Sequence, residues 1–266
     1  MYPRDFFDTY WRTDLRDEVF VAMPFHDEFA QVWEMAVRPA IEDDSGTGLR
    51  ARRVDASILA GSIITDILDG IAHSRLILAD ISVASEGRWK GQRNGNVMYE
   101  VGLAHAVRQS TEILLIRSDD EAVNFDIAQI NVHRYPLHDL DRTRVQLSQL
   151  VVDVLRQIHQ EKSLKVQRAV DILDADTIRY LADYAVHGPF AGPDPKTMGE
   201  TLVAISNRAA LARLQQLGII RANIGIVKGQ TAFVLTAFGA AVATCIGIKG
   251  AAQPGAPVDA PQAARP

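Results

Sequence analysis

Glu100 is the residue most suited to chemistry in this chain, and it lies in the most informative segment, Asp80–Ala106. There a polar loop containing glycines joins an apolar run, Leu76–Leu78, to a helix of small residues. We expect Glu100 in the first turn of that helix, at the C-terminal edge of a parallel sheet, where open α/β folds bind ligands. The positive end of the helix dipole favours an anion, so the pattern predicts an ionised carboxylate able to act as a nucleophile.

The elements that must position this carboxylate alternate between strand and helix over the first part of the chain. Strands are predicted at Glu18–Phe25, Leu49–Val54, Ser74–Ile81, Glu112–Arg117 and Ile130–Tyr135. Helices are predicted at Phe29–Ile41, with a kink or early stop at Pro39, and at Ile58–Ile71, Asn96–Arg108 and Val145–His159.

This alternation implies right-handed crossovers and an α/β fold: a flavodoxin-like, doubly wound parallel sheet of five strands. We expect the strand order 2-1-3-4-5, which places the ends of the first and third strands side by side. Met23, Pro24 and Phe25 are then predicted to converge with Asp80 and Glu100.

The pattern changes after Glu161. A helix at Asp174–Val186 leads into a turn-rich connector, His187–Lys196, and a second helix follows at Ser206–Leu217. That helix is expected to be capped by Ser206 or Asn207 and ended by Gly218; strands at Ile219–Val227 and Thr231–Leu235 and a small-residue helix come after it.

The motifs LxxLxxLGII from Leu211 and LTAFG from Leu235 make this part resemble a winged helix-turn-helix domain. We therefore expect an N-terminal extension (1–17), an α/β domain (18–162), a winged-helix-like domain (163–249) and a disordered Pro/Ala-rich tail (250–266). The 266 residues, 47% of them hydrophobic, are enough for two cores.

The composition gives expectations about disulfides, membrane spans and nucleic-acid binding. The one cysteine, Cys245, cannot form an internal disulfide and is predicted to be a buried small hydrophobe. The N-terminus has no apolar signal segment, so we expect a cytoplasmic protein. The uncharged run Ala232–Ile248 is too short for an easy membrane span, and the net charge of −5 argues against a chain-wide nucleic-acid surface.

Three segments resemble the nucleoside 2-deoxyribosyltransferase-like superfamily, whose relatives include bacterial TIR-like NAD-cleaving domains. They are VFVAMPF, LILADIS and, most specifically, NGNVMYEVGLAHA, within roughly residues 18–135. The resemblance implies that Glu100 is the nucleophile and that Asp80 contacts the sugar. Asn94 stands where the transferases often carry an acid, and Met23-Pro24-Phe25 replaces their glycine-containing turn. The chain therefore looks more like the uncharacterised and defence-associated branches.

The residues themselves suit cleavage of an N-glycosidic bond. Its transition state is oxocarbenium-like, so a carboxylate such as Glu100 can stabilise the positive charge or attack the anomeric carbon. Asp80 could hold sugar hydroxyls and would raise the pKa of a carboxyl crowded against it. Asn94 and Asn96 offer amide donors and acceptors, Asn96 is also a suitable helix cap, and Asp55 follows the second strand.

Tyr99 or Trp89 could stack on a base or nicotinamide ring. Simpler structural explanations are open for several of these residues: Asp80 and Asp55 as strand-end caps, and Trp89 in a solvated basic loop.

No cofactor or metal is predicted. His26, His73, His105 and His133 lack metal-ligand spacing, and there is no Walker, GxGxxG or GxSxG motif. The pairs Arg52-Arg53 and Asp119-Asp120 are typical of solvated charges.

Two classes of function remain. The first is an N-glycosidase or glycosyltransferase acting on a nucleoside, nucleotide or NAD-like ligand, a homo-oligomer with the winged helix as a protein-contact module. The second is a nucleotide-sensing DNA-binding regulator whose α/β domain is not catalytic. Ala209, Ala210 and Ala212 leave the recognition helix few long polar side chains for base edges, so DNA is not favoured.

Overall fold

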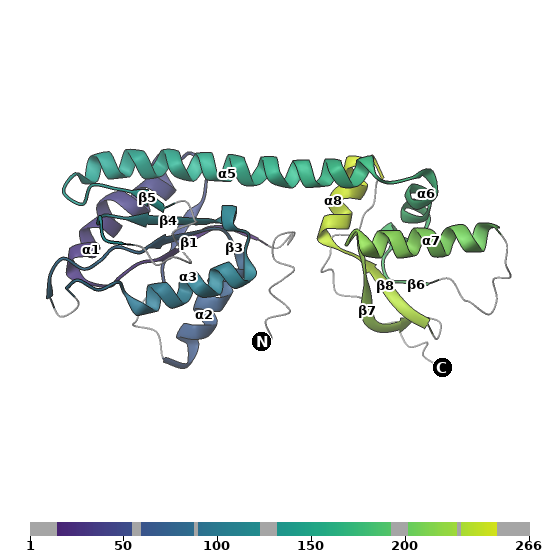
Figure 1. The fold of residues 1–266 in the computed structure, drawn as a ribbon, viewed down its shortest axis with the longest axis horizontal. Coiled ribbons are helices and arrows are strands. Elements are labelled where there is room, and N and C mark those ends of the chain that lie inside the picture. Colours follow the sequence, from purple (N-terminus) through teal and green to yellow (C-terminus); the bar gives the residue numbers. More distant parts are fainter. Residues whose placement is uncertain are drawn as a thin grey trace, which may run out of the picture. The chain divides into compact units, whose positions relative to one another are not determined.

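The computed structural model describes residues 15–54, 60–87, 90–122, 132–192, 202–227 and 230–248 (Figure 1). The chain divides into two compact units between Gln160 and Glu161. Within the described residues, no helix combines the length and the apolar character needed to cross a membrane.

The first unit is built on a parallel sheet of five strands in the order β2-β1-β3-β4-β5. The strands are β1 (Arg16–Ala22), β2 (Arg50–Arg52), β3 (Ser74–Asp80), β4 (Ile113–Arg117) and β5 (Val132–Arg134). This confirms the predicted strand order and fits a flavodoxin-like fold. The predicted strands were too long at most ends; β1 in particular ends at Ala22, so Met23-Pro24-Phe25 follows the strand.

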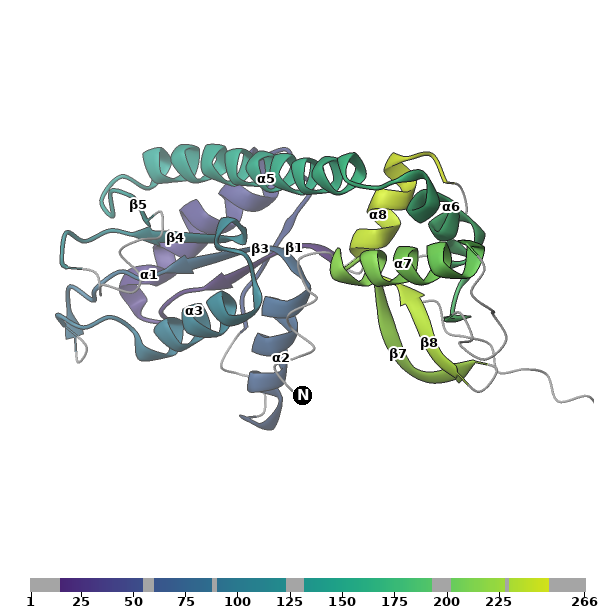
Figure 2. The same cartoon turned by 45° about the vertical axis from the view of Figure 1, so that its right-hand side comes forward.

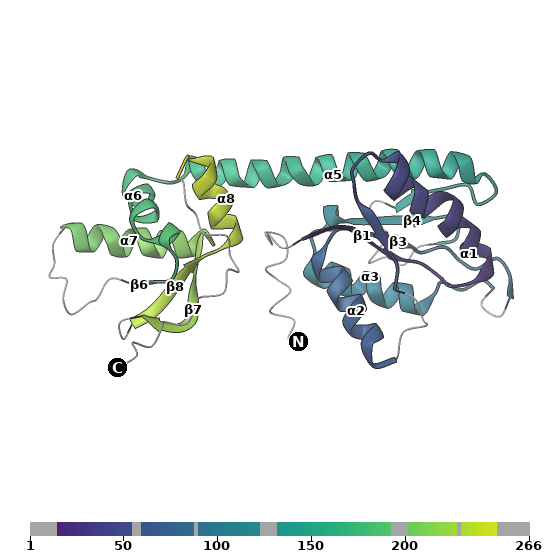
Figure 3. The same ribbon diagram turned by 180° about the vertical axis from the view of Figure 1, so that it is seen from behind.

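Helices cover both faces of the sheet (Figures 1 and 3). One face carries α1 (Asp27–Val32), its continuations η3 (Trp33–Val37) and η4 (Ala40–Asp44), and the first part of α5 (Leu140–Asp171). The other face carries α2 (Ala60–His73) and α3 (Gly95–Val107), and the short turn η6 (Ser110–Glu112) leads into β4.

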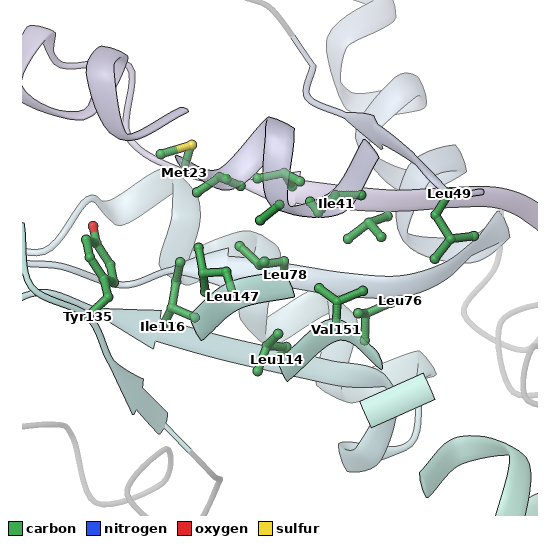
Figure 4. Close-up of a cluster of buried hydrophobic side chains, with 14 of the residues drawn as sticks. Met23, Ile41, Leu49, Leu76, Leu78, Leu114, Ile116, Tyr135, Leu147 and Val151 are labelled. Carbon is green, nitrogen blue, oxygen red and sulfur yellow. The ribbon is translucent and has the colours of Figure 1, made fainter. Parts of the chain in front are cut away.

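Side chains alternate between the two faces along each strand, so each face of the sheet has its own hydrophobic core. Leu76 and Leu78 of β3 pack in the same cluster as Leu147 and Val151 of α5, which Figure 4 shows lying over the sheet. Ile77 and its alternate neighbours belong instead to the cluster that includes α2 and α3. Strands buried on both faces read as continuous apolar runs, which is why the sequence reveals them.

The helix continues past Pro39, so the early stop that was one of the two predicted outcomes does not occur. The helix passes it through π-type turns: the amide of Arg38 bonds Trp33 O, and that of Ser45 bonds Ala40 O at 3.1 Å. Wider turns of this kind absorb a proline that cannot donate a backbone hydrogen bond.

α5 is longer than the predicted Val145–His159 helix, since it runs from Leu140 to Asp171. No glycine or proline interrupts that span, so nothing in its sequence breaks the helix. The division between the two compact units falls within it.

The second unit combines helices with a three-stranded antiparallel sheet in the order β6-β8-β7. Its elements after α5 are α6 (Ala175–Asp183), η7 (Ala185–His187), β6 (Phe190–Ala191), α7 (Leu202–Gln216), β7 (Ile220–Val227), β8 (Gln230–Leu235) and α8 (Ala237–Cys245). Figure 2 shows α7 beside the β7–β8 hairpin. The hairpin was predicted, whereas β6 was missed inside the segment expected to be a connector.

The LTAFG motif is explained by a close approach between α8 and the start of β7. Thr236 caps α8 by accepting the Gly239 amide at 2.9 Å, and its hydroxyl donates to Gly218 O at 2.6 Å. A Cβ on Gly239 would lie 2.1 Å from Ile219 O, so only glycine fits there.

Two further local predictions were wrong. Ser206 and Asn207 lie inside α7, which begins at Leu202, so neither caps it; Gly218, at φ +69°, does follow its end as expected. Cys245 is exposed, because α8 buries Gly239, Val242 and Ala243 instead.

Candidate functional site

Asn94 starts the helix that carries Glu100. It is the N-cap of α3, and its Oδ1 accepts the amides of Asn96 at 2.9 Å and Val97 at 3.3 Å. The predicted cap, Asn96, is instead an exposed residue of the first turn. The cap uses the Oδ1 acceptor of Asn94, whereas its Nδ2 amide takes no part in the cap.

The loop before α3 is a hairpin tied to the end of β4. Val83 and Arg93 form an antiparallel bridge, and Ala84 N donates to Gln92 O at 3.1 Å. Asp119 clamps both arms: Oδ2 accepts Val83 N at 2.9 Å, and Oδ1 pairs with Arg93 Nη2 at 3.2 Å. Arg93 also donates to Ile81 O. The entry to α3 is thereby fixed relative to the sheet edge.

The far end of α3 is fixed by a buried ion pair. Arg108, directly after the helix, pairs with Glu112 at 2.9 Å, and both side chains are fully buried. The same guanidinium donates to Ser74 O at 2.8 Å and Ile71 O at 3.1 Å. Removing one partner of such a buried pair costs about 3–5 kcal/mol, so α3 is firmly anchored.

Glu100 lies in the second turn of α3, not the first, because the helix starts at Gly95. The dipole acts mainly within the first turn, so it does not hold this carboxyl ionised as predicted. Burial instead raises the pKa of Glu100 from its ordinary value of 4.5 to about 7. A carboxyl that titrates near neutral pH can exchange a proton with a ligand, and such groups concentrate at functional sites.

Asp80 is fully buried at the end of β3 and accepts three hydrogen bonds within the chain. Its Oδ1 accepts Ser82 N at 3.0 Å and Ser82 Oγ at 2.5 Å, and its Oδ2 accepts the Tyr135 hydroxyl at 2.6 Å. Ser82 Oγ in turn accepts Ser118 N at 2.9 Å. Burial raises the pKa of Asp80, although the bonds from Ser82 and Tyr135 act in the opposite direction.

This network ties together the ends of β3, β4 and β5. Asp80 follows Leu76 and Leu78 at period-two spacing, and Tyr135 belongs to the same core cluster as those two leucines. Glu100 belongs to the helix on the other face. The described contacts therefore present the two carboxylates from opposite faces, and the raised pKa of Glu100 comes from burial.

The remaining predicted contact residues differ in how far they are exposed. Met23 and Pro24 are buried, whereas Phe25 and Tyr99 are 53% and 58% exposed. Asp55 and Trp89 lie outside the described residues. Exposed aromatic faces suit stacking, so Tyr99, next to Glu100 on α3, keeps its predicted role as a proposal.

A cavity of about 710 Å³ lies on the α1 side of the sheet. Its lining residues are Glu18, Phe25, His26, Ala30, Trp33, Glu34, Arg38, Glu42, Arg50, Ala51, Arg52 and Arg53. Glu100 and Asp80 are not among them.

Sequence reasoning missed the residues that hold the site together. Arg52-Arg53 and Asp119-Asp120 were interpreted as solvated charges, yet Arg52 pairs with Asp69 at 2.9 Å and Asp119 clamps the hairpin. Tyr135 was treated only as the last residue of a strand. No local pattern marks Tyr135 as the partner of Asp80, because the two residues stand at the ends of strands that β4 separates. No group of three His, Cys, Asp or Glu residues in the described parts is arranged to hold a metal.

The chain was compared with known proteins. No family model and no curated protein sequence matches it. A solved 2-desoxiribosyltransferase from Leishmania mexicana is 21% identical with a TM-score of 0.31, covering 38% of this chain and 65% of that protein. The flavodiiron core of Flv1 from Synechocystis sp. PCC6803 is 10% identical with a TM-score of 0.40, covering 56% of this chain and 37% of that one. The chain thus spans less than two thirds of either protein.

Proposed function

We propose that this chain cleaves or transfers an N-glycosidic bond of a nucleoside, nucleotide or NAD-like ligand, with Glu100 as the catalytic carboxylate. The observation that carries the proposal is the pKa of Glu100, raised to about 7 by burial in a helix fixed at both ends. The NGNVMYEVGLAHA motif around it supports the same chemistry.

Asp80 takes a positioning role in this proposal. Its carboxylate is fully buried and already accepts three hydrogen bonds from Ser82 and Tyr135. We therefore propose that Asp80 orders the loop after β3, and that Asn94, Asn96 and Tyr99 surround the ligand near the start of α3.

The direct test incubates the purified full chain with nucleosides, nucleotides and NAD and measures released base by chromatography. Glu100→Gln keeps the size of the side chain but removes the charge, and we expect it to lower base release at least about 100-fold. Glu86→Gln, on an exposed loop residue, is the control. Unchanged turnover by a folded Glu100→Gln variant would refute the assignment.

A winged-helix character of the second unit, and a DNA-binding regulator as the second candidate, also remain proposals. The strand order β6-β8-β7 and the position of α7 before the hairpin support the winged-helix comparison. The side chains of α7 argue against DNA reading: Arg213 donates to Ile172 O at 2.6 Å and to Asp174 at 3.2 Å, and Asn207 is buried. We favour protein contact, including assembly into a homo-oligomer.

Fluorescence anisotropy with duplex DNA at several salt concentrations separates the candidates. Phosphate contacts by Lys and Arg make binding fall steeply with salt, and we expect no sequence-selective binding at physiological ionic strength. Nanomolar, selective binding abolished by Arg208→Ala would favour the regulator.

A further inference from the structure

The cavity on the α1 side of the sheet is a second place where a ligand could bind. It lies between the helix α1–η3–η4 and the edge strand β2, and its volume of about 710 Å³ is in the range of small-molecule pockets. Six of its lining residues decide what it can bind: the aromatic Phe25 and Trp33 and the arginines Arg38, Arg50, Arg52 and Arg53.

Two of these arginines are held in place by other residues of the first unit. Arg52 Nη1 lies 2.9 Å from Asp69 and 3.7 Å from Glu18. Arg53 Nη2 donates to Pro24 O at 3.1 Å. A guanidinium already ordered in this way loses little side-chain entropy on binding, and its planar fork matches phosphate oxygens.

The two aromatic residues of the cavity lie close to the guanidinium of Arg53. The Arg53 carbon Cζ lies 3.9 Å from the centre of the Phe25 ring and 5.5 Å from the centre of the Trp33 ring. Phe25 is 53% exposed, so part of its ring is accessible to a ligand. An exposed ring next to a cationic plane offers a flat surface on which a ligand ring can stack.

Glu18 provides an independent sign of a missing donor. The residue is only 8% exposed and lines the cavity. Its Oε1 accepts Arg50 Nη2 at 3.0 Å, whereas its buried Oε2 lies 3.7 Å from Arg52 Nη1 and accepts no hydrogen bond among the described residues. A buried carboxylate oxygen without a donor is costly, so a ligand N–H or O–H group would stabilise it.

The other acids of the cavity already have partners. Glu34 pairs with Arg38, and Glu42 accepts the amide of Ala51 at 3.0 Å. With four arginines against three glutamates, the lining carries one formal positive charge in excess, His26 taken as neutral. Recognition of an anion here would therefore depend on placed guanidinium donors, with only a small contribution from net charge.

We infer that this cavity binds a nucleotide, because that class combines a phosphate, a flat ring and N–H or O–H donors. The phosphate lies against Arg50, whose side chain is 76% exposed, the ring stacks on Phe25, and a ligand donor reaches Glu18 Oε2. The inference goes beyond the proposed function and does not rest on it, since Glu100 is not part of the lining.

Calorimetric titration of the full chain with AMP, adenosine and inorganic phosphate tests the inference. We expect AMP to bind at least about tenfold more tightly than either fragment, since each contributes only part of the contacts. Arg50→Gln should weaken AMP binding by about tenfold or more, through loss of a charge-assisted contact. Arg156→Gln is the matched control: an exposed arginine of α5 that pairs with Asp153.

Phe25→Ala should lower the affinities for AMP and for adenosine together and leave the affinity for inorganic phosphate unchanged. The titration is repeated in Glu100→Gln, which removes the proposed catalytic group. Retained AMP affinity there supports a site separate from Glu100, and lost affinity overturns it. Equal affinity for AMP and adenosine, or no difference between the variants at Arg50 and Arg156, would also overturn the inference.

Discussion

Ionisation of Glu100 should make the first unit less stable, and Glu100→Gln should remove this effect. The folded pKa of about 7 lies above the ordinary value of 4.5, so the folded state binds the proton more tightly than the unfolded chain. The contribution of Glu100 to stability is therefore largest below pH 4.5, falls as the pH rises to about 7, and stays low above it.

The size of the effect follows from the two pKa values. Their difference, 7 minus 4.5, is 2.5 units. At about 1.36 kcal/mol per unit, this gives an upper limit of about 3.4 kcal/mol. Because Glu100 is only partly buried, we expect about 1–3 kcal/mol at pH 8 and under about 1 kcal/mol at pH 5.

Thermal unfolding of wild type and Glu100→Gln at pH 5 and pH 8 measures this difference. At pH 8 the variant should melt higher by about 2–12 °C, since 1 kcal/mol corresponds to about 2–4 °C in a chain of this size. At pH 5 the two midpoints should nearly coincide, and Glu86→Gln should show no such dependence on pH. A variant that is equally or less stable at pH 8 would refute the burial of Glu100 described above.

Two further predictions concern the residues that position the site. Tyr135→Phe removes a donor to buried Asp80 and should cost about 1–3 kcal/mol. Burial raises the pKa of Asp80, so this loss should grow as rising pH ionises the carboxyl; urea unfolding at several pH values, with exposed Tyr99→Phe as the control, checks it. Asn94→Ala should cost about 1 kcal/mol as a lost helix cap, whereas Asn96→Ala should cost under about 0.5 kcal/mol. Equal thermal midpoints for the two Asn variants would contradict the cap geometry.

The fold was largely predictable because its strands are buried on both faces. Leu76–Ala79 and Ile113–Ile116 are continuous apolar runs, and alternation with helices then leaves few possible topologies. Strand ends were predicted less well, since propensity does not show where hydrogen bonding stops. Met23-Pro24-Phe25 continues the apolar run of β1, but pairing with β3 ends at Ala22.

The candidate site was predictable only in part. The motif locates Glu100, but the pKa of that group depends on burial, which the local sequence does not show. Asp80 was selected for its position at a strand end, yet its partner Tyr135 is 55 residues away in the chain. The clamp between Arg93 and Asp119 likewise joins residues 26 positions apart. Contacts of this kind are set by tertiary packing, so a single sequence cannot reveal them.

Placement of the two carboxylates on opposite faces changes the chemistry that the first unit can be expected to perform. Because Asp80 is hydrogen-bonded to Ser82 and Tyr135, β3 supplies no second acid to act together with Glu100. Its pKa of about 7 then makes the pH profile informative. A nucleophile must be ionised, so its rate would rise through pH 7 to a plateau, whereas a general acid must be protonated and its rate would fall over the same range. The direction of that change assigns the role of Glu100 without identifying the ligand.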